Sequence, residues 1–278
     1  MGTIHRGTSR RRAVSGRVKE NTLKRRLQAG ETVVGTWMNL GEPLVAGLLA
    51  SHGWDWLLID MEHGPIPLAD AAAMVTAVRA QDGVPIVRVA WNESSQIQRV
   101  LDLGAWGIMV PVVNTAADAR RVVRDARFPP MGERSRGGVR GNLAFNADPA
   151  TYSLRANDEI LVLVQVETEQ SVANVAEILA VDGIDGVFVG PNDLAFSGGK
   201  PWPDVWRKDE AYMKLIDAVP RAAEAAGKFA GILAREAQQA LQMIEHGYRF
   251  VGVGGDVTFL NNGSKQWLEM VRASQKPG

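Results

Sequence analysis

Cysteine is absent from the 278-residue chain, which excludes disulfides, thiolate metal sites and a thiol nucleophile. No run of about 18 apolar residues is present, so we expect no membrane span, and the N-terminus lacks the apolar core of a secretory signal. Neither sign of charge is in excess, because 31 basic residues balance 31 acidic ones. These absences argue against nucleic-acid and membrane partners, and they favour a cytoplasmic protein that binds a small molecule.

Residues 1–21 differ in composition from the rest of the chain, since Arg6, Arg10, Arg11 and Arg12 lie among Gly, Ser and Thr with few apolar residues. We interpret this segment as a basic, disordered N-terminal tail, followed by a single domain at residues 22–278. A nucleic-acid or targeting role for the tail is the alternative. The remaining sequence has no aromatic and basic surface that would extend such a role.

Short β-rich runs alternate with segments of helical spacing from about residue 32 onward. The expected strands are residues 32–37, 56–60, 85–89, 107–111, 160–166, 186–190, 229–233 and 249–253. They are nearly continuous apolar runs, as parallel strands covered on both faces should be. Eight such units predict an α/β fold, the TIM (β/α)₈ barrel. One longer irregular stretch, residues 128–157, is expected to cover the site or to contact another subunit.

An open, doubly wound sheet is the less favoured architecture. It would need a Gly-rich turn after the first strand, and residues 38–43 read Met-Asn-Leu-Gly-Glu-Pro instead.

Two acids, Glu167 and Asp193, come directly after expected strands, and their 26-residue separation corresponds to one strand, one helix and two loops. Consecutive parallel strands would bring both acids to the same rim of a barrel. Either acid alone would more often be a helix cap. As a pair without nearby His or Cys ligands, they predict a site for a divalent cation such as Mg²⁺, Mn²⁺ or Co²⁺.

His63 is the histidine that the pattern places at this rim, in the turn Asp60-Met-Glu-His-Gly after the second expected strand. An imidazole there can transfer protons, although it could equally cap the next helix. Asp60 is a candidate to orient it. Asp102, near the end of the helix after the third strand, is a second candidate, with a solvent-facing helix-end position as the alternative.

Arg88 interrupts an apolar strand, where an unpaired guanidinium would be costly to bury, so it needs an anionic partner. A substrate carboxylate or enolate oxygen is favoured over a structural salt bridge. Gln165 shares a strand face with Glu167 and is expected to bind substrate or water on the metal. Trp37 and Leu233, at the ends of the first and seventh expected strands, are further candidates for substrate contact.

No lysine lies within an expected strand, where a Schiff-base aldolase would need one. In an aldolase reaction, the metal rather than a lysine is therefore expected to draw electron density from the bond that breaks.

The sequence resembles the HpcH/HpaI aldolases, metal-dependent pyruvate aldolases, from about residue 22 to 273. The segments that carry the resemblance are residues 56–65 (WLLIDMEHGP), 87–92 (VRVAWN), 163–168 (LVQVET) and 186–194 (GVFVGPNDL). The resemblance implies a barrel of the phosphoenolpyruvate/pyruvate-binding type. It also implies a homohexamer, a trimer of dimers that exchange their eighth helices.

By the same resemblance, Glu167 and Asp193 bind the metal and Arg88 binds pyruvate and stabilises its enolate. His63, with Asp60 and Asp102, assists proton transfer. The pyruvate carboxylate is implied to lie on the backbone around Pro191, Asn192 and Asp193.

The resemblance predicts reversible retro-aldol cleavage of a 4-hydroxy-2-oxo acid to pyruvate and an aldehyde. Three alternatives remain open at this point. A phosphoenolpyruvate transferase or mutase would need further cations for the phosphoryl group. A CoA-thioester lyase of the citrate lyase beta type would need a basic entry channel, which Arg134, Arg136 and Arg140 could border. A non-catalytic 2-oxo-acid binding protein would leave His63 without a role.

Overall fold

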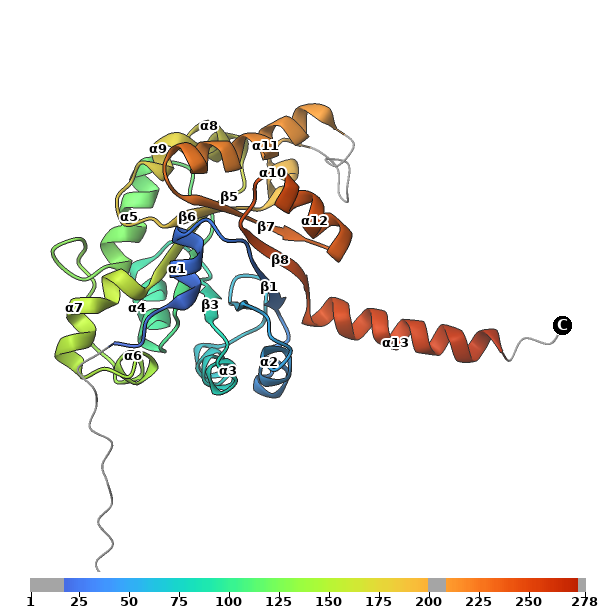
Figure 1. Ribbon diagram of the computed structural model, residues 1–278, viewed down its shortest axis with the longest axis horizontal. Coiled ribbons are helices and arrows are strands. Elements are labelled where there is room, and N and C mark those ends of the chain that lie inside the picture. Colours follow the sequence, from blue (N-terminus) through green and yellow to red (C-terminus); the bar gives the residue numbers. More distant parts are fainter. Residues whose placement is uncertain (1–17, 200–208, 275–278) are drawn as a thin grey trace, which may run out of the picture.

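The computed structural model describes residues 18–199 and 209–274, and its centre is a closed barrel of parallel strands (Figure 1). Each strand pairs with the next along the chain, and β1 pairs with β8 to close the barrel. The strands are β1 (Val33–Met38), β2 (Trp56–Asp60), β3 (Pro85–Arg88), β4 (Gly107–Val110), β5 (Leu161–Val166), β6 (Gly186–Val189), β7 (Phe229–Ala234) and β8 (Phe250–Gly255). The predicted TIM barrel is confirmed, with small shifts at the strand ends.

Helices follow the strands and surround most of the barrel (Figure 1). They are α1 (Thr22–Gln28), α2 (Pro43–Ala50), α3 (Leu68–Ala80), α4 (Ser94–Asp102), α5 (Ala116–Ala126), α6 (Arg140–Ala144), α7 (Pro149–Glu159), α8 (Glu169–Ala173), α9 (Val175–Leu179), α10 (Pro191–Ser197), α11 (Glu210–Ala225), α12 (Ala237–Glu245) and α13 (Asp256–Ala273).

Aromatic side chains from several strands pack together inside the barrel. The Trp56 ring stacks on Phe250 with a centroid separation of 4.0 Å, and Trp37 packs against Phe188 at 5.2 Å. Gly35 on β1 makes room for this packing, because a Cβ atom there would lie 2.1 Å from the Trp56 ring. The interior is therefore a packed core rather than a pore, and the space for a ligand must lie at its ends.

Residues 18–21, which were predicted to belong to the N-terminal tail, make contacts with the barrel. Residues 1–17 lie outside the described residues. Asn21 is fully buried, its side chain caps α1, and its Nδ2 donates to the backbone oxygens of Trp106 and Glu159. The sequence around Asn21 does not predict these contacts, because their partners, Trp106 and Glu159, lie far away in the chain.

The stretch from 128 to 157, expected to be irregular, contains α6 and most of α7. Its first part is held by Arg134, whose buried guanidinium lies over the Phe128 ring at 4.5 Å and donates to Asp102 Oδ1 at 2.9 Å. This part of the chain is thus fixed to the end of α4.

Helix α13 differs from the other helices because it projects away from the barrel (Figure 1). Of its residues only Asp256 is buried, whereas Leu260, Trp267 and Val271, one helical face, are exposed. Exposed apolar side chains also occur on α2, at Leu44 and Leu48. Among the described residues, no helix is both long and apolar enough to cross a bilayer.

Candidate active site

Glu167 and Asp193 converge at the carboxyl end of the barrel. Glu167 directly follows β5, and Asp193 lies in the first turn of α10, directly after β6. Between them is Gly190: a Cβ atom added to this glycine would lie 2.9 Å from Glu167 Oε2 and 3.3 Å from Asp193 Oδ2. Both oxygens therefore lie within 3.3 Å of one point, which residue 190 leaves unfilled because it has no side chain. The two acids face one small space, as shared ligation of an ion requires.

The Glu167 carboxylate is fixed by two donors. Its Oε1 accepts a hydrogen bond of 2.6 Å from the backbone N–H of Val112, and its Oε2 accepts one of 2.9 Å from Gln165 Nε2. Val112 has a φ of 54°, a left-handed conformation that is costly for a β-branched residue. Strain of this kind persists where the surrounding structure requires it, and here it aims a backbone donor at Glu167.

The donor set at this point suits a hard divalent cation. Carboxylate oxygens are the ligands that Mg²⁺ and Mn²⁺ prefer. Within residues 18–199 and 209–274, no group of three or more His, Asp or Glu side chains is arranged to hold a metal. A cation at this point would be held by Glu167 and Asp193, with substrate and water completing the coordination.

Two acids at the rim, Glu167 and Glu62, have raised pKa values. Burial raises the pKa of Glu167 to about 7, and the charges of Glu62 and Asp193 act in the same direction, opposed by the Val112 amide and Arg88. Burial also raises the pKa of Glu62 to about 6, despite the opposing effect of Arg88. A bound cation would favour the ionised carboxylates, because it offsets both the desolvation and the mutual repulsion.

Arg88 forms salt bridges with two acids of the protein, which was the less favoured of its two predicted roles. It is paired with Asp60 in register across β2 and β3, and it donates from Nε and Nη2 to both Asp60 oxygens, at 2.9 and 2.6 Å. The remaining nitrogen, Nη1, lies 3.0 Å from Glu62 Oε2 and 3.3 Å from Gln165 Oε1. One edge of the guanidinium is therefore held by Asp60, and the other faces Glu62 and the cavity residue Gln165.

His63 lies at the mouth of the site with its side chain 64% exposed, and its Nε2 is 3.9 Å from Glu62 Oε2. The expectation that Asp60 orients this imidazole is wrong. The Asp60 oxygens are occupied by Arg88, by Asn39 Nδ2 at 2.7 Å, and by the backbone N–H groups of Glu62 and His63. Asp60 thus positions the backbone of the turn, and Glu62 is the carboxylate near the ring.

Asp102 does not reach His63 within one chain. It ends α4, which runs from the rim back toward the amino-terminal end of the barrel, and it pairs with Arg134. Its contact with Arg134 at the end of α4 gives it a partner other than His63, so the role predicted for Asp102 stays a prediction.

The rim residues enclose a cavity of about 250 Å³. The residues predicted to bind substrate line it together with His63, which was predicted to be catalytic. The predicted substrate-binding residues are Trp37, Arg88, Gln165, Pro191, Asn192, Asp193 and Leu233. Three further lining residues, Phe188, Gly190 and Arg235, and the neighbouring Glu62 were not among the predicted site residues. Glu62 adjoins His63 in the sequence, but its contact with Arg88 depends on the pairing of β2 with β3.

Substitution of Gly190 by alanine tests the shared space between the acids. The glycine has an ordinary φ of −93°, so alanine strains no backbone, yet its Cβ would lie 3.0 Å from Glu167 Cβ and closer still to Oε2. We expect the variant to fold normally and to bind Mn²⁺ at least about tenfold more weakly, since each 1.4 kcal/mol of displaced ligation is tenfold. Titration calorimetry measures this.

The matched control is Gly47→Ala on α2, where the nearest atom to the new Cβ is 3.8 Å away. Equal Mn²⁺ affinity in both variants and the parent protein would contradict a shared site at Gly190.

A closed parallel barrel whose carboxyl rim gathers two converging acids, a buried arginine and a histidine around a small cavity defines a TIM-barrel enzyme that acts on a small molecule. Comparison of the sequence with known protein families identifies the family to which this enzyme belongs. The family profile for HpcH/HpaI aldolase/citrate lyase matches residues 34–263, and the chain belongs to this family.

Relatives cover nearly the whole chain. It is 39% identical over 248 residues to the hydroxypyruvate/pyruvate aldolase of Roseovarius nubinhibens, which covers 89% of this chain and 95% of the relative. It is 38% identical over 262 residues to the 4-hydroxy-2-oxo-heptane-1,7-dioate aldolase of Salmonella heidelberg, with 92% and 97% covered. The crystal structure of a family member from Burkholderia cenocepacia superimposes with a TM-score of 0.84 at 39% identity, covering 91% of this chain and 99% of the other.

Proposed function

We propose that the protein is a metal-dependent aldolase that cleaves a 4-hydroxy-2-oxo acid to pyruvate and an aldehyde, and runs the reverse condensation. The observation that carries the proposal is the convergence of Glu167 and Asp193 beside Arg88. Relatives that are 38–39% identical over most of their length are named as aldolases, which supports this activity over a CoA-thioester lyase.

The cation would be held by Glu167 and Asp193. When bound there, Mg²⁺, Mn²⁺ or Co²⁺ supplies a Lewis acid that draws electron density from the 2-oxo acid. The backbone of Pro191, Asn192 and Asp193 lines the same cavity and would lie against the pyruvate carboxylate. Gln165, fixed between Glu167 and Arg88, orients the head of the substrate.

Bond cleavage then needs one proton acceptor and one cation from the chain. His63 takes the proton of the C4 hydroxyl as the C3–C4 bond breaks, which releases the aldehyde. The electron pair of that bond moves to C3 and the keto oxygen, and Arg88 Nη1 stabilises the resulting enolate. Protonation at C3 completes pyruvate. The exposed position of His63 suits a group that exchanges its proton with solvent.

The test is metal-dependent release of pyruvate. The purified protein is treated with EDTA, divided, and assayed with and without Mn²⁺ on a panel of 4-hydroxy-2-oxo acids, with pyruvate followed by a coupled dehydrogenase. We expect product in the Mn²⁺ samples alone. Absence of metal-dependent pyruvate across the panel, or cleavage of a CoA thioester instead, would contradict the proposal.

We further propose that α13 docks on a second copy of the chain. In a barrel, the helix after β8 would lie between α12 and α2, and the exposed Leu44 and Leu48 on α2 border that position. The apolar face of α13, which includes Leu260 and Trp267, matches it in character. Exchange of α13 between two copies buries both surfaces, which supports a homo-oligomer built from dimers.

Charged substitutions on either surface should separate the copies. We expect Trp267→Asp on α13 and Leu48→Asp on α2 each to reduce the assembly to a smaller species, because a carboxylate would be buried without a partner. Sedimentation velocity measures the mass. Lys265→Gln, on the opposite, charged face of α13 beside Glu269, is the control and should leave the mass unchanged. Unaltered assembly in both Asp variants would refute the exchange.

A further inference from the structure

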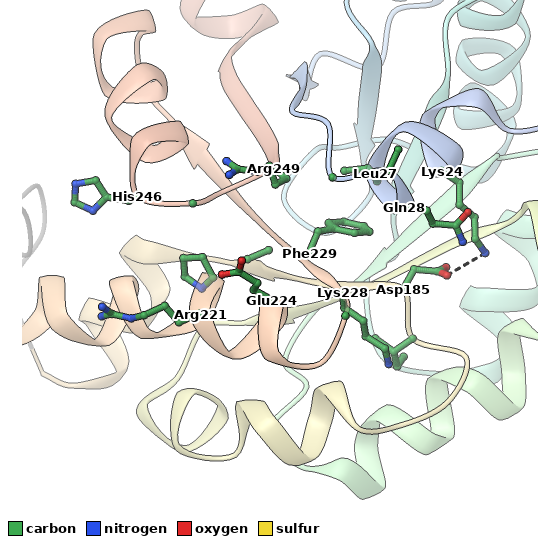
Figure 2. Close-up of a pocket in the computed structure, with 17 residues that line it drawn as sticks. Lys24, Leu27, Gln28, Asp185, Arg221, Glu224, Lys228, Phe229, His246 and Arg249 are labelled. Carbon is green, nitrogen blue, oxygen red and sulfur yellow. Dashed lines mark ion pairs between the residues drawn. The ribbon is translucent and has the colours of Figure 1, made fainter.

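A larger cavity lies at the opposite, amino-terminal end of the barrel (Figure 2). Its volume is about 640 Å³, against about 250 Å³ at the rim. Its walls come from α1, from the end of α11, and from the segments that lead into β6, β7 and β8. None of the residues assigned to the aldolase site lines it.

Positive charge is in excess on these walls. The cationic side chains are Lys24, Arg221, Lys228 and Arg249, whereas the carboxylates are Asp185 and Glu224. His246 also lines the cavity, but its Nδ1 contacts Asp217 Oδ1 at 2.6 Å.

Two of these cations are positioned by neutral oxygens. Lys228 Nζ donates to the carbonyl oxygens of Leu179 and Val181, the latter at 2.9 Å, and Arg249 Nη1 donates to those of Ile244 and Tyr248, both at 3.2 Å. Carbonyl groups fix a side chain without cancelling its charge. Within the described part of the chain, neither Lys228 nor Arg249 has an ion-pair partner within 4.0 Å.

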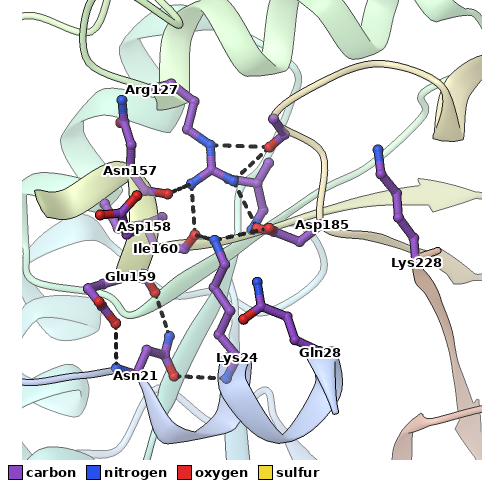
Figure 3. A network of polar contacts seen from close by, with 12 residues as sticks. Asn21, Lys24, Gln28, Arg127, Asn157, Asp158, Glu159, Ile160, Asp185 and Lys228 are labelled. Carbon is purple, nitrogen blue, oxygen red and sulfur yellow. Dashed lines mark hydrogen bonds and ion pairs between the residues drawn. The ribbon is translucent and has the colours of Figure 1, made fainter. Parts of the chain in front are cut away.

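Asp185, one of the two carboxylates on these walls, is already shared by two buried cations (Figure 3). Lys24 Nζ lies 3.0 Å from its Oδ1, and Arg127 Nη2 lies 2.8 Å from its Oδ2. The Lys24 and Arg127 side chains are only 5% and 2% exposed. Burial lowers the pKa values of Lys24 and Lys228, and the Arg127 charge adds to this effect, whereas Asp185, and for Lys228 also Asp182, act in the opposite direction. The walls still carry four cationic side chains against two carboxylates, so an anion would be attracted to them.

An adjoining cavity of about 340 Å³ shares Lys24 and Asp185 with the first, but the two arginines that it adds, Arg25 and Arg155, are paired with Glu159 and Asp158. The first cavity, with several cations on its walls, is therefore the one that suits a ligand with more than one charged group.

We propose that this amino-terminal cavity binds a small organic anion that carries two or more phosphate or carboxylate groups. The anion would accept hydrogen bonds from Arg249 and reach Arg221, while Lys228, whose side chain points to the opposite side of the cavity (Figure 2), would add positive charge. It would thereby connect α11 with the segment before β8, and its binding to the folded state alone would raise the melting temperature. The proposal rests on the cavity and its charges and does not depend on the aldolase reaction.

The experiment titrates fructose 1,6-bisphosphate and tricarballylate into the full-length protein with Mg²⁺ at constant ionic strength, by calorimetry, with fructose as the neutral probe. We expect at least one anion to bind with a Kd below about 1 mM. The double variant Arg221→Gln/Arg249→Gln should bind at least about tenfold more weakly. Glu224→Gln, which removes a negative charge from the wall, should bind more tightly, a gain that misfolding cannot mimic.

The control is Arg99→Gln/Arg120→Gln, which makes the same change of net charge on exposed side chains elsewhere and should bind as the parent does. Anions that bind no better than fructose would overturn the proposal. So would equal affinity in the two double variants, because the anion would then occupy another place. The bisphosphate binding in preference to the tricarboxylate, or the reverse, identifies the anionic group.

Discussion

Replacement of Glu167 by glutamine should lower the turnover number for pyruvate release by at least about 10⁴-fold, measured at saturating Mn²⁺. The substitution keeps the shape of the side chain but removes its charge. Both oxygens of the Glu167 carboxylate accept hydrogen bonds, one from Val112 N–H and the other from Gln165 Nε2. In the variant, the NH₂ group of the glutamine would therefore face one of these donors instead of an acceptor. Glu167 is 6% exposed, and a water molecule in its place would bind the cation without the negative charge of the carboxylate.

His63→Ala is the comparison that gives this result its meaning. General acid–base catalysis typically contributes about 10²–10⁴-fold, and water can reach a side chain that is 64% exposed, so we expect a loss near the lower limit. Circular dichroism and Mn²⁺ titration on both variants separate lost ligation from lost folding. Equal, modest losses of turnover in the two variants would refute this division of roles between cation and histidine.

The barrel and its rim acids could be predicted because both depend on local pattern. Each strand is a short apolar run, and an acid placed directly after such a run must lie at the carboxyl rim once the strands are parallel. The position of Glu167 and Asp193 at the rim could therefore be predicted without knowing which distant residues they contact. The cavity gathers Trp37, Gln165 and Leu233 for the same reason, since each belongs to a strand near that rim.

The partners of these residues could not be predicted, because they depend on register and on segments far apart in the chain. Asp60 faces Arg88 rather than His63 since β2 and β3 pair at those two residues. The Val112 amide reaches Glu167 because Val112 has a left-handed backbone conformation. This conformation could not be predicted, because residue 112 is a valine and not a glycine or asparagine. The position of Asp102 could be predicted only with the direction and the length of α4, which ends at this residue.

Arg88 should be essential both for turnover and for stability. We expect Arg88→Lys to lower the turnover number about 10²–10³-fold, the usual cost of one lost donor to a developing oxyanion. Lysine keeps the charge, but it cannot hold both Asp60 oxygens and also present a nitrogen beside Glu62 and Gln165. Steady-state rates of pyruvate release at saturating metal, with KM determined separately, measure the effect.

The stability effect appears when the charge is removed. Arg88→Met is similar in length but leaves Asp60 and Glu62 buried without their cation, so the free energy of unfolding in urea should fall by about 3–5 kcal/mol. The double variant Arg88→Met/Asp60→Asn should recover part of that loss, because the buried negative charge is gone, while turnover stays low. If Arg88→Met unfolds at the same urea concentration as the parent, the Asp60–Arg88 pair is not what holds this rim together. If Arg88→Lys turns over normally, the guanidinium is not the group that stabilises the enolate.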